Sequence, residues 1–145
     1  MIEVSLPVYI ALWVGIVVVL LTTVIIITRA LNIRGKSAGL DADLVAMRME
    51  RIESLLAGAS DTEWSLAIIE ADKLLDYLLK ARHIAGTTLG ERLKVACYKH
   101  KELRNVWEAH KVRNRIVHEH SVQLAKRDAM RYWQQYKSAY KVLMR

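Results

Sequence analysis

The chain has 145 residues, 53% of them hydrophobic, and a formal net charge of +7. Because domains commonly contain about 100–150 residues, this length predicts one modest domain and excludes an enzyme with a separate nucleotide-binding domain. The only cysteine, Cys97, has no partner for an internal disulfide. A single proline argues against a proline-rich or collagen-like chain.

The apolar residues are concentrated near the N-terminus. Residues 8–28 form 21 consecutive uncharged positions, which as a helix would be about 31 Å long and would match the apolar core of a bilayer. Three basic residues follow this stretch and none precedes it: Arg29, Arg34 and Lys36. The positive-inside rule therefore predicts a single-pass anchor in the cell membrane, with residues 1–7 outside and the C-terminal part in the cytoplasm. Residues 29–40 are predicted to be a basic juxtamembrane linker.

Residues 41–145 show helical periodicity without the sustained alternation typical of strands. We therefore predict an all-α fold, in which a transmembrane helix precedes a small cytoplasmic bundle of four to five helices. The elements predicted for this bundle are helices over 41–57, about 61–85, about 89–96, about 102–119 and about 126–144.

Local signals set several of these boundaries. Ser60 with Glu63, and Thr88 with Glu91, have the spacing of capping boxes that open the second and third helices. Gly86 is predicted to end the second helix. The last helix carries an apolar stripe at steps of three and four, which we interpret as core: Ala129, Trp133, Tyr136, Tyr140 and Leu143.

Charge is divided unevenly along the predicted bundle. Residues 41–91 contain 5 basic and 10 acidic side chains, a net charge of −5, whereas residues 92–145 contain 14 basic and 4 acidic side chains, a net charge of +10. A basic half of this kind is compatible with binding a nucleic-acid backbone. The alternative is that these cations neutralise the acidic second helix and otherwise form a solvated surface.

Polar residues gather on the predicted fourth helix. His110, Asn114 and His118 are four residues apart and share one face, next to core positions. Buried polar groups need hydrogen-bond partners, because leaving them unpaired costs several kcal/mol. One interpretation is therefore a structural network that joins this helix to Asp72 or Glu70 on the second helix.

The run from Arg113 to His118 has the pattern Arg-Asn-x-x-x-His. This pattern resembles the HEPN superfamily of small helical domains. The block from Trp64 to His118 is also similar to uncharacterised bacterial membrane-anchored proteins of this type. The resemblance covers about residues 60–145 and does not include the anchor. It implies a metal-independent endoribonuclease that acts as a homodimer, with no metal site and no cofactor.

The resemblance also implies roles for individual side chains. Arg113 would bind the scissile phosphate and stabilise its developing charge, and His118 would act as base or acid. Further binding or orienting residues are expected to be Asn114, His110, Arg115, Asp72 and Glu70. On one ideal helix, Arg113 and His118 lie about 140° apart and about 7.5 Å apart along the axis. They can meet at one phosphate only if the helix ends or bends near His118, or if two subunits form the cleft.

The expected partners are the lipid bilayer, through residues 8–28, a second copy of the chain, and RNA. The alternative function is a non-catalytic module at the cytoplasmic face of the membrane. Such a module would dimerise, dock an unidentified protein partner or bind nucleic acid without cleaving it.

Overall fold

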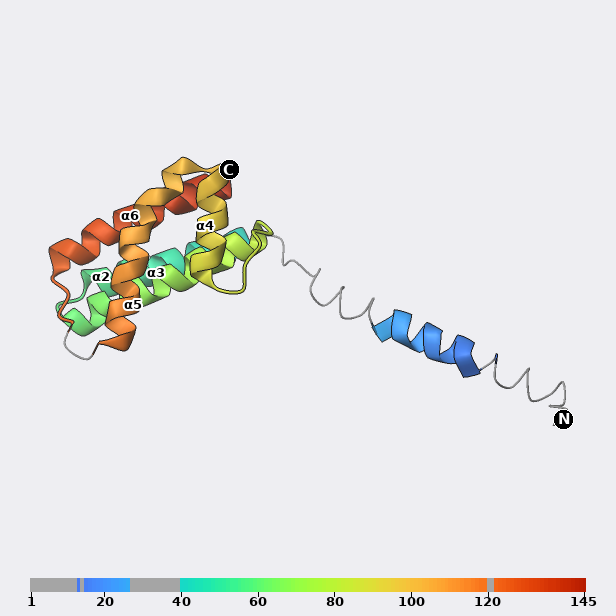
Figure 1. Ribbon diagram of the computed structural model, residues 1–145. Coiled ribbons are helices and arrows are strands. Elements are labelled where there is room, and N and C mark those ends of the chain that lie inside the picture. Colours follow the sequence, from blue (N-terminus) through green and yellow to red (C-terminus); the bar gives the residue numbers. More distant parts are fainter. Residues whose placement is uncertain (1–12, 14, 27–39, 120–121) are drawn as a thin grey trace, which may run out of the picture. The chain divides into compact units, whose positions relative to one another are not determined.

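The computed structural model describes residues 13, 15–26, 40–119 and 122–145. The chain divides into two compact units, residues 1–37 and 38–145, which are described separately. The second unit contains α2 (Ala42–Ala57), α3 (Asp61–Ala81), α4 (Leu89–Lys99), the 3₁₀ helix η1 (Lys101–Asn105), α5 (Val106–His118) and α6 (Lys126–Met144) (Figure 1). The described residues contain no strand, which confirms the predicted all-α class.

In the first unit, residues 15–26 are helical and their large apolar side chains are exposed. No helix within the described residues is both long enough and apolar enough to cross a membrane. The predicted anchor, residues 8–28, extends over positions outside the described residues. The predicted outer segment 1–7 and residues 29–39 of the predicted linker also lie outside them.

Helix α3 is the centre of the second unit, since it packs against α2, α4, α5 and α6. Its leucines form much of the core, and four of them are fully buried: Leu74, Leu75, Leu78 and Leu79. The predicted apolar stripe on the last helix is confirmed, because all five of its residues are buried in α6. The core of this unit is thus formed by residues between positions 45 and 143.

Side-chain caps are present at the starts of α2, α3 and α4, and those of α3 and α4 are the predicted ones. The carboxylate of Asp41 accepts a hydrogen bond from the backbone at the start of α2. Both predicted capping boxes are present, Ser60 with Glu63 at α3 and Thr88 with Glu91 at α4. These caps depend on residues three positions apart, so the local sequence is sufficient to predict them.

The predicted end of the second helix is wrong. Helix α3 ends at Ala81, before the turn that contains Gly86. The terminating residue is His83, which adopts a positive φ of 55°, and the N–H of Ile84 donates to the carbonyl of Leu79 at 3.0 Å. This is the bonding pattern of a Schellman motif, here closed by a histidine where glycine is usual.

The predicted fourth helix, 102–119, is also only partly correct. Its first turn is the separate 3₁₀ helix η1, and α5 begins at Val106. A 3₁₀ helix has about 3.0 residues per turn and an α-helix about 3.6, so η1 and α5 do not share one continuous face. Leu103 in η1 is buried, whereas Val117 near the end of α5 is 47% exposed.

Candidate functional site

The candidate site is a cleft of ≈ 650 Å³ between α3, the start of α4 and α5. Four of the predicted site residues line it: Asp72, His110, Arg113 and Asn114. The other three do not: Glu70, Arg115 and His118. The structure therefore places Asp72 of α3 in one cleft with residues from the middle of α5. His118, the last residue of the motif, lies outside this cleft.

Asp72 is the buried anchor of this cleft, with no exposed surface. Its Oδ1 atom lies 2.8 Å from Nδ1 of His110 and accepts a hydrogen bond of 3.0 Å from the hydroxyl of Tyr136. Its Oδ2 atom lies 3.0 Å from Nε of Arg113. This last contact is an ion pair by distance but is not aligned as a hydrogen bond. One carboxylate thus joins α3 to both α5 and α6.

The contacts continue around a closed ring of four side chains. Nη1 of Arg113 donates to Oδ1 of Asn114 at 2.9 Å, and Nδ2 of Asn114 lies 3.3 Å from Nε2 of His110. Because the amide oxygen of Asn114 is occupied by Arg113, its NH₂ group faces the imidazole and Nε2 must accept. The proton of neutral His110 is therefore assigned to Nδ1, which donates it to Asp72.

Two tyrosines of α6 close the buried side of the ring. Burial, together with the nearby charge of Asp72, raises the pKa of Tyr136 and of Tyr140 well above the usual value. Both hydroxyls therefore remain protonated donors, and Tyr140 donates to the carbonyl of Ala71 at 2.6 Å. The apolar stripe of the last helix predicted Tyr136 only as a core residue. Its residue type could have indicated a polar contact, because a buried tyrosine hydroxyl needs a hydrogen-bond partner and a phenylalanine ring does not.

A second ion-pair group forms the other wall of the cleft. Arg92 is only 7% exposed; its Nε donates to Asp76 at 2.9 Å, and its Nη1 donates to the carbonyl of Gly86. Burial alone would raise the pKa of Asp76, but hydrogen bonds from Lys80 and Arg92 outweigh burial and hold this pKa below its usual value. Arg92 thus fixes the turn before α4. No motif in the sequence pointed to this residue.

The exposed cations of the cleft are lysines. The side chains of Lys73 and Lys80 are 56% and 58% exposed, and they pair at the surface with Glu70 and Asp76. Glu70 therefore pairs with its neighbour on α3, and Asp72 alone forms the predicted link to α5. Surface pairs of this kind contribute little to stability, so the two lysines can turn toward an anion in the cleft.

His118 and Arg115 lie outside the cleft. Both are exposed on α5, and within the described residues neither side chain makes a hydrogen bond or an ion pair. Helix α5 ends at His118, but Arg113 and His118 still do not line a common cleft in one chain. The other arrangement that the sequence allowed, a cleft shared between two subunits, stays a prediction.

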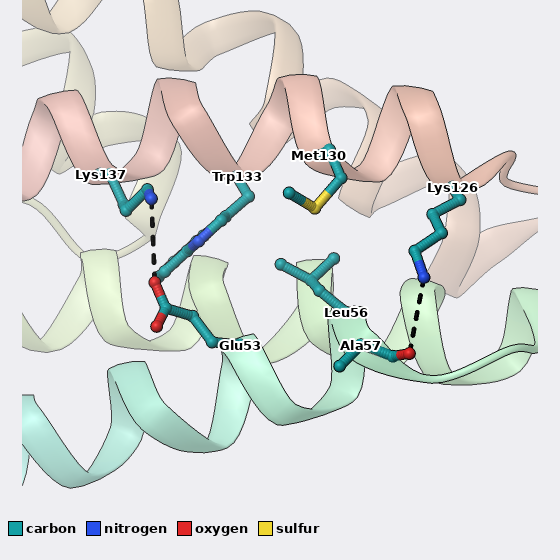
Figure 2. A pocket seen from close by; sticks show the side chains of 7 residues that line it. All are labelled: Glu53, Leu56, Ala57, Lys126, Met130, Trp133 and Lys137. Carbon is teal, nitrogen blue, oxygen red and sulfur yellow. Dashed lines mark hydrogen bonds and ion pairs between the residues drawn. The ribbon is translucent and has the colours of Figure 1, made fainter.

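A smaller hollow of ≈ 300 Å³ lies between α2 and α6. Figure 2 shows Leu56 and Met130 pointing toward one another across it, with Trp133 as one wall. The lysines at its two ends are already engaged. Lys126 donates to the backbone carbonyls at the end of α2, and Lys137 lies 3.8 Å from a carboxylate oxygen of α2. This hollow therefore offers apolar contact but fewer free polar groups than the cleft.

Comparisons of the chain with protein-family models, with curated proteins and with solved structures found no match. Within the described residues, no group of three His, Cys, Asp or Glu side chains is arranged to hold a metal ion. The ring at the wall of the cleft contains a buried carboxylate, an imidazole, an amide and a guanidinium.

Proposed function

We propose that residues 41–145 form a HEPN-like helical domain that binds RNA in this cleft and cleaves it without a metal ion. The observation that carries the proposal is the guanidinium of Arg113, which buried Asp72 holds at the wall of the cleft. The guanidinium lies against Asp72 through Nε and donates to Asn114 through Nη1, and the hydrogens of Nη2 are the donors that would match the oxygens of a phosphate.

The remaining charge in the cleft supports the same ligand. The side chain of Arg113 is 27% exposed, so solvent and ligand can reach it. Lys73 and Lys80 lie along the same cleft and are more exposed still. A polyanion that passes over these three cations would replace weak surface pairs with charge-assisted contacts to phosphate.

A homodimer would supply His118. Since Arg113 and His118 do not line one cleft within a chain, a second copy is needed to bring His118 to a phosphate bound by Arg113. The exposed position of His118 at the end of α5 is compatible with this role. In the dimer, His118 would act as acid or base toward RNA bound to the other subunit.

We also propose that residues 8–28 anchor the domain in the cell membrane, with the domain itself in the cytoplasm. The exposed apolar side chains of residues 15–26 support this part of the proposal, because a lipid bilayer would cover them. The anchor would keep the RNA-cleaving domain at the inner face of the membrane.

The test is a cleavage assay with the full chain in detergent micelles and a mixture of RNAs, in the presence of EDTA. Arg113→Lys keeps the charge beside Asp72 but removes the planar pair of donors. We expect it to lower the cleavage rate about 100-fold. Arg115→Lys is the matched control on the same helix and should stay within about threefold of the unaltered chain.

Loss of all cleavage in EDTA, or equal effects of the two arginine substitutions, would contradict the proposal. His118→Ala should lower the rate of RNA cleavage about 100-fold. It should not lower the free energy of unfolding, because the side chain of His118 is exposed. This differs from the non-catalytic interpretation of the sequence, in which His118 belongs to a buried network and its loss mainly destabilises the fold.

One observation favours a second candidate function, a non-catalytic docking or nucleic-acid-binding module. The ring of Asp72, His110, Asn114 and Arg113 is largely satisfied within one chain, as a purely structural network would be. A module of this kind would bind RNA without cleaving it, and its affinity would fall steeply with added salt. The cleavage assay and a binding titration at two salt concentrations separate the two functions.

A further inference from the structure

The imidazole of His110 has the surroundings of an oriented proton-transfer group. The residue is 7% exposed, its Nδ1 atom is fixed on Asp72 at 2.8 Å, and it lines the cleft beside Arg113. A Cβ atom at Gly90 would lie 3.8 Å from Nε2. The lack of a side chain at this position therefore leaves room beside the Nε2 edge of the ring.

Cleavage of RNA by its own 2′-hydroxyl benefits from two such groups, a base for the attacking oxygen and an acid for the leaving oxygen. The Arg113–His118 motif supplies only one imidazole. Resting on the function proposed above, we infer that His110 is the general base of this site, that Asp72 positions it, and that His118 is the general acid.

The step that follows is balanced. Nε2 of His110 takes the proton of the 2′-hydroxyl, the 2′-oxygen forms a bond to phosphorus, and the bond from phosphorus to the 5′-oxygen breaks. Protonated His118 gives its proton to the 5′-oxygen. The products are a 2′,3′-cyclic phosphate and a 5′-hydroxyl, and Arg113 stabilises the charge on the phosphate oxygens between them.

The contacts of His110 with Asp72 and Asn114 explain why this residue is suited to act as the base and not as the acid. With its proton on Nδ1, the neutral imidazole keeps the lone pair of Nε2 for an incoming hydrogen. Asn114 now occupies that lone pair at 3.3 Å, a long hydrogen bond that a ribose hydroxyl can replace. The carboxylate of Asp72 then stabilises the imidazolium that forms, in the manner of an Asp–His pair in hydrolases.

The test compares two substrates, an RNA dinucleotide and uridine 3′-(4-nitrophenyl phosphate). The nitrophenolate leaves without being protonated, so its release needs a base but no acid. His110→Asn keeps an N–H donor near Asp72 and lacks Nε2. We expect this variant to lose about 100-fold in rate on both substrates. His118→Ala should lose about 100-fold on the dinucleotide and stay within about threefold on the aryl ester.

A His110→Asn variant that cleaves the aryl ester within about threefold of the unaltered chain overturns the inference and leaves the proposed ribonuclease function standing. An unaltered chain that cleaves neither substrate rejects the function and the inference together. For His118→Ala, the difference between substrates reports the chemical role, because a loss of folding would lower both rates. His110→Asn should lower both rates, as a loss of folding also would, so a second variant is needed for this residue.

Gly90→Leu provides a second variant that leaves every member of the ring in place. Its side chain would cover the Nε2 edge of His110 from the first turn of α4, where leucine favours the helix more than glycine does. We expect a rate loss of about tenfold or more on both substrates, with no loss in unfolding free energy. Unchanged rates on both substrates would show that Nε2 is not approached from this side and would overturn the inference.

Discussion

Replacing Asp72 by Asn tests how much of the fold depends on one buried charge. The substitution keeps the shape of the side chain and one acceptor oxygen, but it removes the negative charge that receives His110 at 2.8 Å, Tyr136 at 3.0 Å and Arg113 at 3.0 Å. The new NH₂ group must also face one of these donors. Removing one partner of a buried ion pair costs about 3–5 kcal/mol. Since Arg113 is partly exposed and regains water, we expect a loss near the lower limit, about 3 kcal/mol.

The measurement is urea unfolding followed by tryptophan fluorescence, to which Trp133, 1% exposed in the folded chain, contributes. For a slope of about 1–3 kcal/mol per molar urea, a loss of this size lowers the midpoint by about 1–3 M. Glu70→Gln is the matched control, since Glu70 lies on the same helix and pairs with Lys73 at the surface. Its effect should stay below about 1 kcal/mol. If the two variants unfold at the same midpoint, the ring around Asp72 does not stabilise the fold as described.

Three further predictions follow from single groups. Folding lowers the pKa of Asp76, so this carboxylate stabilises the fold fully above its unfolded pKa, and the stabilisation is lost as the pH falls through its folded pKa. Below about pH 4, the free energy of unfolding should therefore fall less with acid in Asp76→Asn than in the unaltered chain. Tyr140→Phe removes the hydrogen bond to Ala71 and should lower the free energy of unfolding, measured with urea, by about 1 kcal/mol. No change would show that water replaces this bond. Burial raises the pKa of the Cys97 thiol, which lowers its thiolate fraction. A thiol reagent at pH 8 should therefore react about tenfold more slowly with the folded chain than with the urea-unfolded chain. Equal rates would contradict the buried position of Cys97.

Most of the helical frame could be predicted from the sequence, because it follows from local signals. The N-cap at Asp41 and the capping boxes at Ser60 and Thr88 involve residues within one helical turn. Helix α6 has the predicted bounds, since its apolar stripe and its start at Lys126 are local too. The end of α3 was not predictable in this way, because no local rule selects a positive φ for His83.

The site was predictable in part. Spacing on one helix placed His110 and Asn114 together and required a partner for them, and Asp72 on α3 provides it. Spacing alone left Glu70 equally eligible, because the choice depends on how α3 is rotated against α5. The hydroxyl of Tyr136 reaches the same carboxylate from α6, across 64 positions of sequence. Contacts over such a separation are set by packing and have no local signal.

The division of charge along the chain has a structural meaning that bears on RNA binding. Two of the acidic residues of α3 bind cations from the basic half, Asp72 with Arg113 and Asp76 with Arg92. Part of the excess of positive charge is therefore used inside the fold, as the alternative interpretation of the sequence held. Arg92 also lines the cleft but is only 7% exposed, whereas the side chain of Arg113 is 27% exposed. Of these two paired cations, Arg113 is therefore the one that the proposed function requires, because a phosphate in the cleft can reach it.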